Sequence, residues 1–123
     1  MSEIERIGVS QRLSDVIVHG DTIYFSGYVA EAAAGRSVRE QTQDILNQID
    51  ESLAQVGSDK SKLLEATVWL ADMSGYAEMN EVWVRWVAPG RPPTRACVEA
   101  RLASPDMRSR SGSSPPSDAT EER

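Results

Sequence analysis

The spacing of apolar residues predicts several short strands and two helices along the first hundred residues. Three β-rich runs in the first part of the chain predict strands: Ile4–Gly8, Val16–Val18 and Ile23–Phe25. Gly20 and Asp21 lie between the last two runs, and glycine accepts the positive φ that a tight hairpin turn requires. We therefore expect an antiparallel hairpin over Asp15–Val29.

A helical stripe follows this hairpin. Apolar residues between Val38 and Val56 recur at spacings of three, four and seven, which is typical of an amphipathic helix. Ser37 with Glu40 fits a capping box at its start, and Gly57 fits its end.

The next segments alternate strand and helix. The apolar run Ala66–Leu70 predicts a strand buried on both faces, and Tyr76–Val87 repeats at helical spacing before Pro89 and Gly90 end the helix. Thr94–Leu102 alternates apolar and polar residues, which predicts a strand with one apolar and one polar face. The element order β-β-β-α-β-α-β predicts an α+β domain in which two helices pack on one face of a mixed sheet.

The apolar pattern stops near Ser104. From Ser104 to Arg123 only Met107 and Ala119 are apolar, and serine, proline and arginine dominate. A segment this poor in apolar groups does not fold alone. We therefore divide the chain into a folded domain, residues 1–103, and a tail, residues 104–123, which we expect to be disordered.

Charge and composition exclude several classes of function. The chain has 13 basic and 19 acidic residues, a net charge of −6, which argues against non-specific binding of nucleic acid or anionic membranes. No apolar run is long enough to cross a membrane and no signal peptide is visible, so we expect a cytoplasmic protein. Cys97 and His19 are the single cysteine and histidine, which argues against a disulfide, a metal centre or a histidine-based triad.

Four residues are candidates for a binding site. Arg95 follows a rigid Pro-Pro pair, and its paired donors suit a carboxylate, although an ordinary surface arginine is the alternative. Cys97 lies on the same face as Arg95. Its role is open between a nucleophile, a backbone hydrogen-bond donor and a small residue that fills space in the core. Ser26 and Gly27 end a strand, where glycine permits either close approach of a ligand or a simple bulge.

Three blocks of sequence resemble a known family. They are Gly-Ser-Asp-Lys-Ser-Lys-Leu-Leu at 57–64 leading into Ala-Thr-Val-Trp-Leu-Ala-Asp-Met at 66–73, Tyr-Ala-Glu-Met-Asn at 76–80, and Pro-Pro-Thr-Arg-Ala-Cys-Val-Glu at 92–99. Together they resemble the RidA/YjgF family of reactive-intermediate deaminases, near its short YoaB-like branch. The resemblance extends from about Arg6 to Met107.

The resemblance implies a chorismate mutase-like fold and a homotrimer with sites in the clefts between subunits. It implies hydrolysis of enamines and imines, such as 2-aminoacrylate, 2-iminopropanoate and 2-iminobutanoate, to 2-keto acids and ammonia, with no metal or organic cofactor. The resemblance implies that Arg95 binds the substrate carboxylate and that the backbone of Cys97 lies near the imine. It also implies that Ser26 and Gly27 form the wall of the cleft.

Two departures from the family pattern affect these expectations. Leu13 stands where a tyrosine is common, and the tail replaces the final family strand. Arg110 then occupies the position of the glutamate thought to position the hydrolytic water. We expect the final strand to be absent, the protein to be less stable and its activity to be impaired. The tail is either a substituted terminus, as after a shift of reading frame, or a genuinely divergent one.

Two other functions are open from the sequence. One is a non-catalytic trimeric module that binds small carboxylates or regulates a partner. The other is an endoribonuclease, which the acidic balance and the lack of a basic patch make less favourable.

Overall fold

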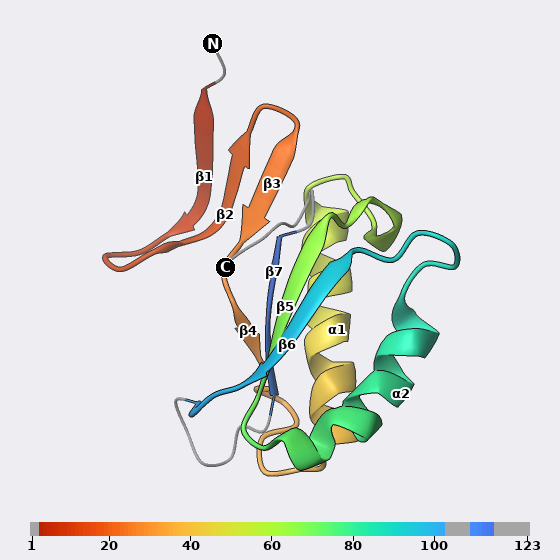
Figure 1. Cartoon of the computed structure of the whole chain (residues 1–123). Helices are drawn as coiled ribbons and strands as arrows, with labels where there is room; N and C mark the ends of the chain where they lie inside the picture. Colours follow the sequence, from red (N-terminus) through yellow and green to blue (C-terminus); the bar gives the residue numbers. More distant parts are fainter. Residues whose placement is uncertain (1–2, 103–108, 115–123) are drawn as a thin grey trace.

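The first sheet is an antiparallel three-stranded unit at the N-terminal end of the chain (Figure 1). The computed structural model describes residues 3–102 and 109–114. The strands of this sheet are β1 (Ile4–Val9), β2 (Ser14–His19) and β3 (Thr22–Phe25), in that order. Gly20 has φ 64° in the turn between β2 and β3, so the predicted hairpin is confirmed. It ends at Phe25, however, and the chain bends away before Val29.

The second sheet is mixed and has the order β4-β7-β5-β6. Its strands are β4 (Tyr28–Val29), β5 (Glu65–Leu70), β6 (Thr94–Glu99) and β7 (Ser109–Ser114). β5 and β6 are parallel, while β7 runs antiparallel to both β4 and β5. The mixture of parallel and antiparallel pairing agrees with the predicted α+β class.

β7 corrects two expectations drawn from composition. The final strand was expected to be absent and residues 104–123 to be disordered, but residues 109–114 pair with β5 along its whole length and with β4 at two positions. Composition reports only what side chains contribute, whereas every non-proline residue offers the N–H and C=O groups that a sheet pairs. The rest of the predicted tail, 104–108 and 115–123, lies outside the described residues.

Two helices cover one face of the second sheet (Figure 1). They are α1 (Val38–Gln55) and α2 (Tyr76–Trp86), and short 3-10 turns precede β5 and α2 at Lys60–Lys62 and Met73–Gly75. The predicted capping box is present: the Ser37 hydroxyl accepts from the Glu40 amide at 3.1 Å, and the Glu40 carboxylate accepts from the Ser37 amide at 3.4 Å. The caps explain why α1 begins where the sequence predicted.

The main core lies between the second sheet and the helices. Its fully buried side chains come from α1, β5 and α2: Ile45, Leu46, Ile49, Leu53, Leu70 and Met79. Trp83 and Trp86 of α2 are also buried. β5, predicted to be buried on both faces, buries only the face with Ala66, Val68 and Leu70, while Trp69 on the other face is half-buried in the single chain.

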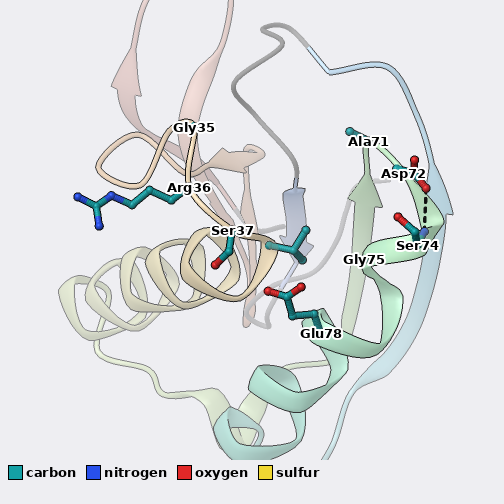
Figure 2. Close-up of a pocket in the computed structure, with 9 residues that line it drawn as sticks. Gly35, Arg36, Ser37, Ala71, Asp72, Ser74, Gly75 and Glu78 are labelled. Carbon is teal, nitrogen blue, oxygen red and sulfur yellow. Dashed lines mark hydrogen bonds between the residues drawn. The ribbon is translucent and has the colours of Figure 1, made fainter.

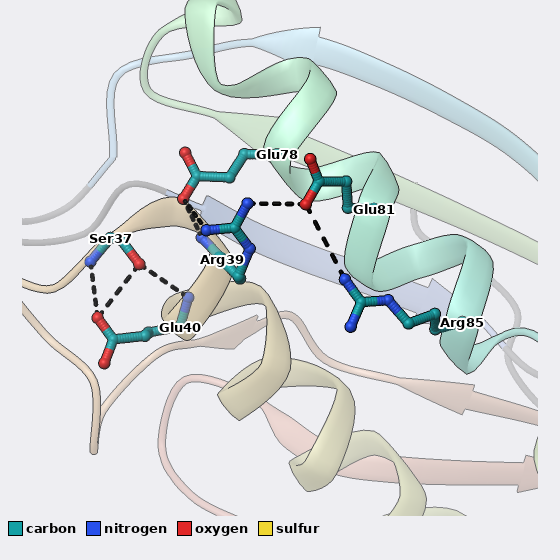
Figure 3. A network of polar contacts seen from close by, with 6 residues as sticks. All are labelled: Ser37, Arg39, Glu40, Glu78, Glu81 and Arg85. Atoms are coloured by element: carbon teal, nitrogen blue, oxygen red, sulfur yellow. Dashed lines mark hydrogen bonds and ion pairs between the residues drawn. The ribbon is translucent and has the colours of Figure 1, made fainter.

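A polar network joins α1 to α2 at the protein surface (Figure 3). Arg39 of α1 pairs with Glu81 of α2 at 2.7 Å, and its backbone amide donates to Glu78 at 3.0 Å. Arg85 lies 3.9 Å from the same Glu81 carboxylate. Because exposed ion pairs contribute little to stability, we attribute the stability of the helix pair mainly to its buried apolar contacts.

Candidate functional site

The register of β6 turns its polar residues toward the helices. Arg95 pairs with Ala66 and Cys97 with Val68, and both partners on β5 are buried against the helices. Arg95 and Cys97 are accordingly half-buried, whereas Ala96 and Val98 are exposed. β6 therefore has the predicted apolar and polar faces, but within one chain the apolar face is the exposed one.

Arg95 is held by side chains from one face of α2. Its Nη1 donates to Asn80 Oδ1 at 2.7 Å and its Nη2 donates to Tyr76 Oη at 3.2 Å. The guanidinium carbon lies 5.8 Å from the centroid of the Tyr76 ring and 5.3 Å from that of Trp83, within the range of cation–π attraction. These contacts fix a guanidinium at the edge of the sheet.

The charge of Arg95 has no acidic partner among the described residues. In that part of the chain, ion pairs are formed by Arg36, Arg39 and Arg85, all of them on the surface. A half-buried cation held by neutral groups attracts an anion, because its desolvation is only partly offset by the amide, the hydroxyl and the rings. The local chemistry is therefore that of an anion-binding site.

Cys97 lies two residues further along β6 with its thiol partly buried. Burial raises the pKa of this thiol above its ordinary value, and the positive charge of Arg95 pulls the pKa only partly back. The side chain is thus a neutral thiol at neutral pH, which disfavours a nucleophilic role.

The backbone of Cys97 is better placed for binding than its thiol. The amides of Thr94 and Ala100 donate to Leu64 and Leu70 on the β5 side at 3.0 and 2.9 Å. Because hydrogen bonding alternates along a parallel strand, the N–H and C=O of Cys97 point away from β5. β6 ends the sheet, and no strand among the described residues covers that edge.

Ser26 and Gly27 form the bend between the two sheets. The Ser26 hydroxyl donates to the Ser14 carbonyl at 2.6 Å, and its amide donates to the Asp15 carbonyl at 3.0 Å. Both residues line a cavity of about 310 Å³ between the first sheet and α1, together with Gln48 and others. The bend therefore exposes backbone next to an opening.

The structure does not bring these two groups of residues together within one chain. Ser26 and Gly27 directly precede β4 at one end of the second sheet, while Arg95 and Cys97 lie on β6 at the other end. β7 and β5 lie between, so the two ends are separated by three strand spacings, roughly 14 Å.

A second cavity, of about 450 Å³, lies at the start of α1 (Figure 2). It is lined by the 35–38 loop and by residues near the 3-10 turn before α2. Its polar groups already have partners: Ser37 caps α1, Asp72 accepts from the Ser74 amide at 2.8 Å, and Glu78 accepts from Arg39. We therefore place the candidate site at Arg95 rather than here.

Sequence reasoning missed the residues that hold Arg95. Tyr76, Asn80 and Trp83 were interpreted as members of a helical stripe, and the first two also as part of the 76–80 block that carries the family resemblance, but none was given a role at the site. Their spacing of four and three does place them on one face of α2, as the structure shows. What the pattern could not indicate is that this face meets Arg95 as well as the core. The described residues contain no group of three or more His, Cys, Asp or Glu placed to hold a metal ion.

The fold defines the class of protein. A mixed sheet with two helices on one face is the chorismate mutase-like fold of the solved YjgF-family structures. A YjgF-family member from Neisseria meningitidis superposes with a TM-score of 0.84 at 49% identity, over 89% of this chain and 90% of the other. Yeast Mmf1, at 20% identity and a TM-score of 0.75, shares the fold.

Sequence comparison gives the family. The family model described as Endoribonuclease L-PSP matches residues 3–109. A RutC family protein from Haemophilus influenzae is 47% identical over 102 residues, covering 83% of this chain and 88% of the relative. The RutC family protein YoaB from Escherichia coli is 42% identical with the same coverage of both chains. The chain therefore belongs to this RutC/YjgF family, and the predicted resemblance is confirmed. No helix within the described ranges is long and apolar enough to cross a membrane.

Proposed function

We propose that the protein is a cytoplasmic imine deaminase. It hydrolyses reactive enamines and imines of 2-keto acids, such as 2-aminoacrylate with its tautomer 2-iminopropanoate, and 2-iminobutanoate, to the 2-keto acid and ammonia. The observation that carries this proposal is the half-buried guanidinium of Arg95, which lies at an open sheet edge without an acidic partner among the described residues.

The reaction needs orientation more than strong catalysis. Water adds to the electrophilic imine carbon and gives a carbinolamine, whose C–N bond then breaks to release ammonia and leave the keto group. Protons move from the water to the departing nitrogen, so no oxidant or reductant is consumed. Holding the carboxylate fixes the adjacent imine carbon, and such positioning removes much of the barrier.

In this proposal each candidate residue has a distinct role. Arg95 binds the substrate carboxylate through its free N–H groups. The outward backbone N–H and C=O of Cys97 lie beside the imine, which is consistent with the neutral state of its thiol. Ser26 and Gly27 form the opposite wall. No metal or organic cofactor enters these steps.

We also propose that a second copy of the chain completes the site, within a homotrimer. Two observations support this: the candidate residues lie at opposite ends of one sheet, and the apolar face of β6 with Ala96 and Val98 is exposed in the single chain. Contact between β6 of one copy and the Ser26–Gly27 bend of the next would cover that face and join the two halves.

Arg110 is the position at which we expect activity to be limited. Arg110 pairs with Val29 of β4, and Val29 follows Gly27 by two residues. Arg110 therefore lies near the Ser26–Gly27 end of the second sheet. An arginine there does not supply the carboxylate that would orient or deprotonate the water. We expect Arg110→Glu to raise the rate of 2-iminobutanoate hydrolysis.

The decisive experiment measures 2-oxobutanoate formation from freshly generated 2-iminobutanoate. Arg95→Ala should lower kcat/KM at least a hundredfold, whereas Arg101→Ala, an exposed arginine just beyond β6, should leave it unchanged. Equal turnover by the wild type and Arg95→Ala would overturn the proposal.

Mixing two inactive variants tests the shared site. Arg95→Ala and Gly27→Val each damage one half, so mixed assemblies contain some sites with both halves intact. Recovery of activity on mixing, with a trimeric mass in solution, is the expected result. No recovery from two folded, trimeric variants would contradict a site shared between copies.

A non-catalytic carboxylate-binding module is the alternative, and it would bind 2-oxobutanoate through Arg95 without turnover by any variant. The endoribonuclease activity in the family model's description is less favoured, because the net charge of −6 opposes binding of a polyanion.

A further inference from the structure

The five N–H groups of the Arg95 guanidinium are not equally available. Nη1 contacts Asn80 Oδ1 at 2.7 Å and Met79 Sδ at 3.8 Å, and one Nη2 hydrogen is directed to Tyr76 Oη at 3.2 Å. Within the described residues, the Nε–H and the second Nη2–H have no acceptor. These two donors are the ones left for an anion.

Tyr76 contacts the guanidinium in two ways. Its hydroxyl accepts from Nη2, and its ring lies 5.8 Å from the guanidinium carbon, with Trp83 at 5.3 Å. Trp83 is buried in the core, whereas 40% of Tyr76 is exposed, so Tyr76 lies where the site opens to solvent. A long arginine side chain otherwise has much rotamer freedom, which it loses on binding a ligand.

We propose that Tyr76 is a positioning residue that sets the preference of Arg95 for carboxylates. The hydroxyl holds one Nη2 hydrogen and the ring restrains the guanidinium plane, so the two remaining donors keep a fixed orientation. A planar carboxylate with two acceptor oxygens benefits from that orientation, and a neutral amide with one acceptor oxygen benefits less. This inference rests on the proposed function for the choice of ligand, but its test does not require turnover.

The experiment measures the dissociation constants of 2-oxobutanoate and of its neutral amide, 2-oxobutanamide, by calorimetry. Tyr76→Phe keeps the ring and removes the hydroxyl, so we expect the preference for the acid over the amide to fall roughly tenfold, the size of a lost hydrogen bond to a charged group. Tyr76→Leu also removes the ring and should reduce the preference further. A merely structural role would weaken both ligands equally.

Tyr24→Phe is the matched control, because Tyr24 is exposed to a similar extent, 42%, and lies on β3. It should bind both ligands as the wild type does. Thermal unfolding checks that each variant is folded, and the Phe variant retains the ring, so its fold is expected to persist.

The outcomes separate this inference from the proposed function. Acid-selective binding that depends on Tyr76, without imine turnover, would refute the deaminase and uphold the positioning role. An unchanged acid-to-amide preference in Tyr76→Phe would overturn the positioning role even if turnover is intact. Failure of the wild type to bind 2-oxobutanoate would overturn it as well.

Discussion

β5 has a neighbour on each side, and the two neighbours differ in what joins them to it. β6 pairs with β5 over six register positions and also places Arg95 and Cys97 against the helix layer. β7 pairs over six positions as well, yet its sequence, Ser-Arg-Ser-Gly-Ser-Ser, contains no apolar residue. β6 is therefore specified by its backbone and its side chains together. β7 has no apolar side chain to bury, so only its backbone pairing specifies it.

The register makes the contrast specific. On the buried face of β5, Ala66, Val68 and Leu70 pair with three serines of β7, at positions 113, 111 and 109. Backbone hydrogen bonds contribute only about 1 kcal/mol each in net terms, and burial of apolar groups adds far more. β7 is therefore expected to be the weakest strand of the second sheet.

The largest expected effect comes from removing β7. A chain ending at residue 108 should lose several kcal/mol of unfolding free energy relative to one ending at residue 114, because β4 loses its partner strand and β5 one of its two. Urea denaturation followed by tryptophan fluorescence measures the difference. Equal denaturation midpoints for the two chains would show that the pairing of β7 adds nothing to stability.

A smaller effect, of opposite sign, is expected from giving β7 an apolar residue. Ser111 pairs with buried Val68, so Ser111→Val should stabilise the fold by about 1 kcal/mol through burial and strand propensity. Ser114→Val is the control, because Ser114 pairs with the exposed Glu65. If both variants changed stability equally, the register would not explain the weakness of β7.

The smallest expected effect concerns the β6 side. Burial raises the pKa of Cys97 and Arg95 lowers it, so Arg95→Met, which keeps the cover but removes the charge, should raise that pKa further. The thiolate forms only as pH rises toward the pKa, so alkylation by iodoacetamide near pH 8.5 should be a few-fold slower in the variant. Alkylation at the wild-type rate would mean that the charge of Arg95 does not reach the thiol.

The same contrast explains what the sequence could predict. The capping box of α1, the hairpin turn at Gly20 and the alternation of β6 all arise from side-chain patterns, and the structure contains each of them. β7 could not be found in that way, because its pairing needs only backbone groups.

For the candidate site, Arg95 and Cys97 were correctly placed on one face of a strand. The contacts of Tyr76, Asn80 and Trp83 with the Arg95 guanidinium were not predicted, because they depend on how α2 lies across β6. Periodicity gives the face of a helix and not the residue that this face meets. The distance between Arg95 and the Ser26–Gly27 bend could not be predicted either, because it depends on the order of the strands in the sheet and not on periodicity.

The central position of β7 has a consequence for synthesis of the protein. β5 is complete at residue 70, but its second neighbour is not made until residues 109–114 are translated. At typical elongation rates of about 5–20 residues per second, that is a delay of roughly 2–8 s. Until β6 is made at residues 94–99 both edges of β5 are open, and from then until β7 is made one edge remains open on the nascent chain. Binding of the nascent chain by chaperones should therefore be concentrated in that interval.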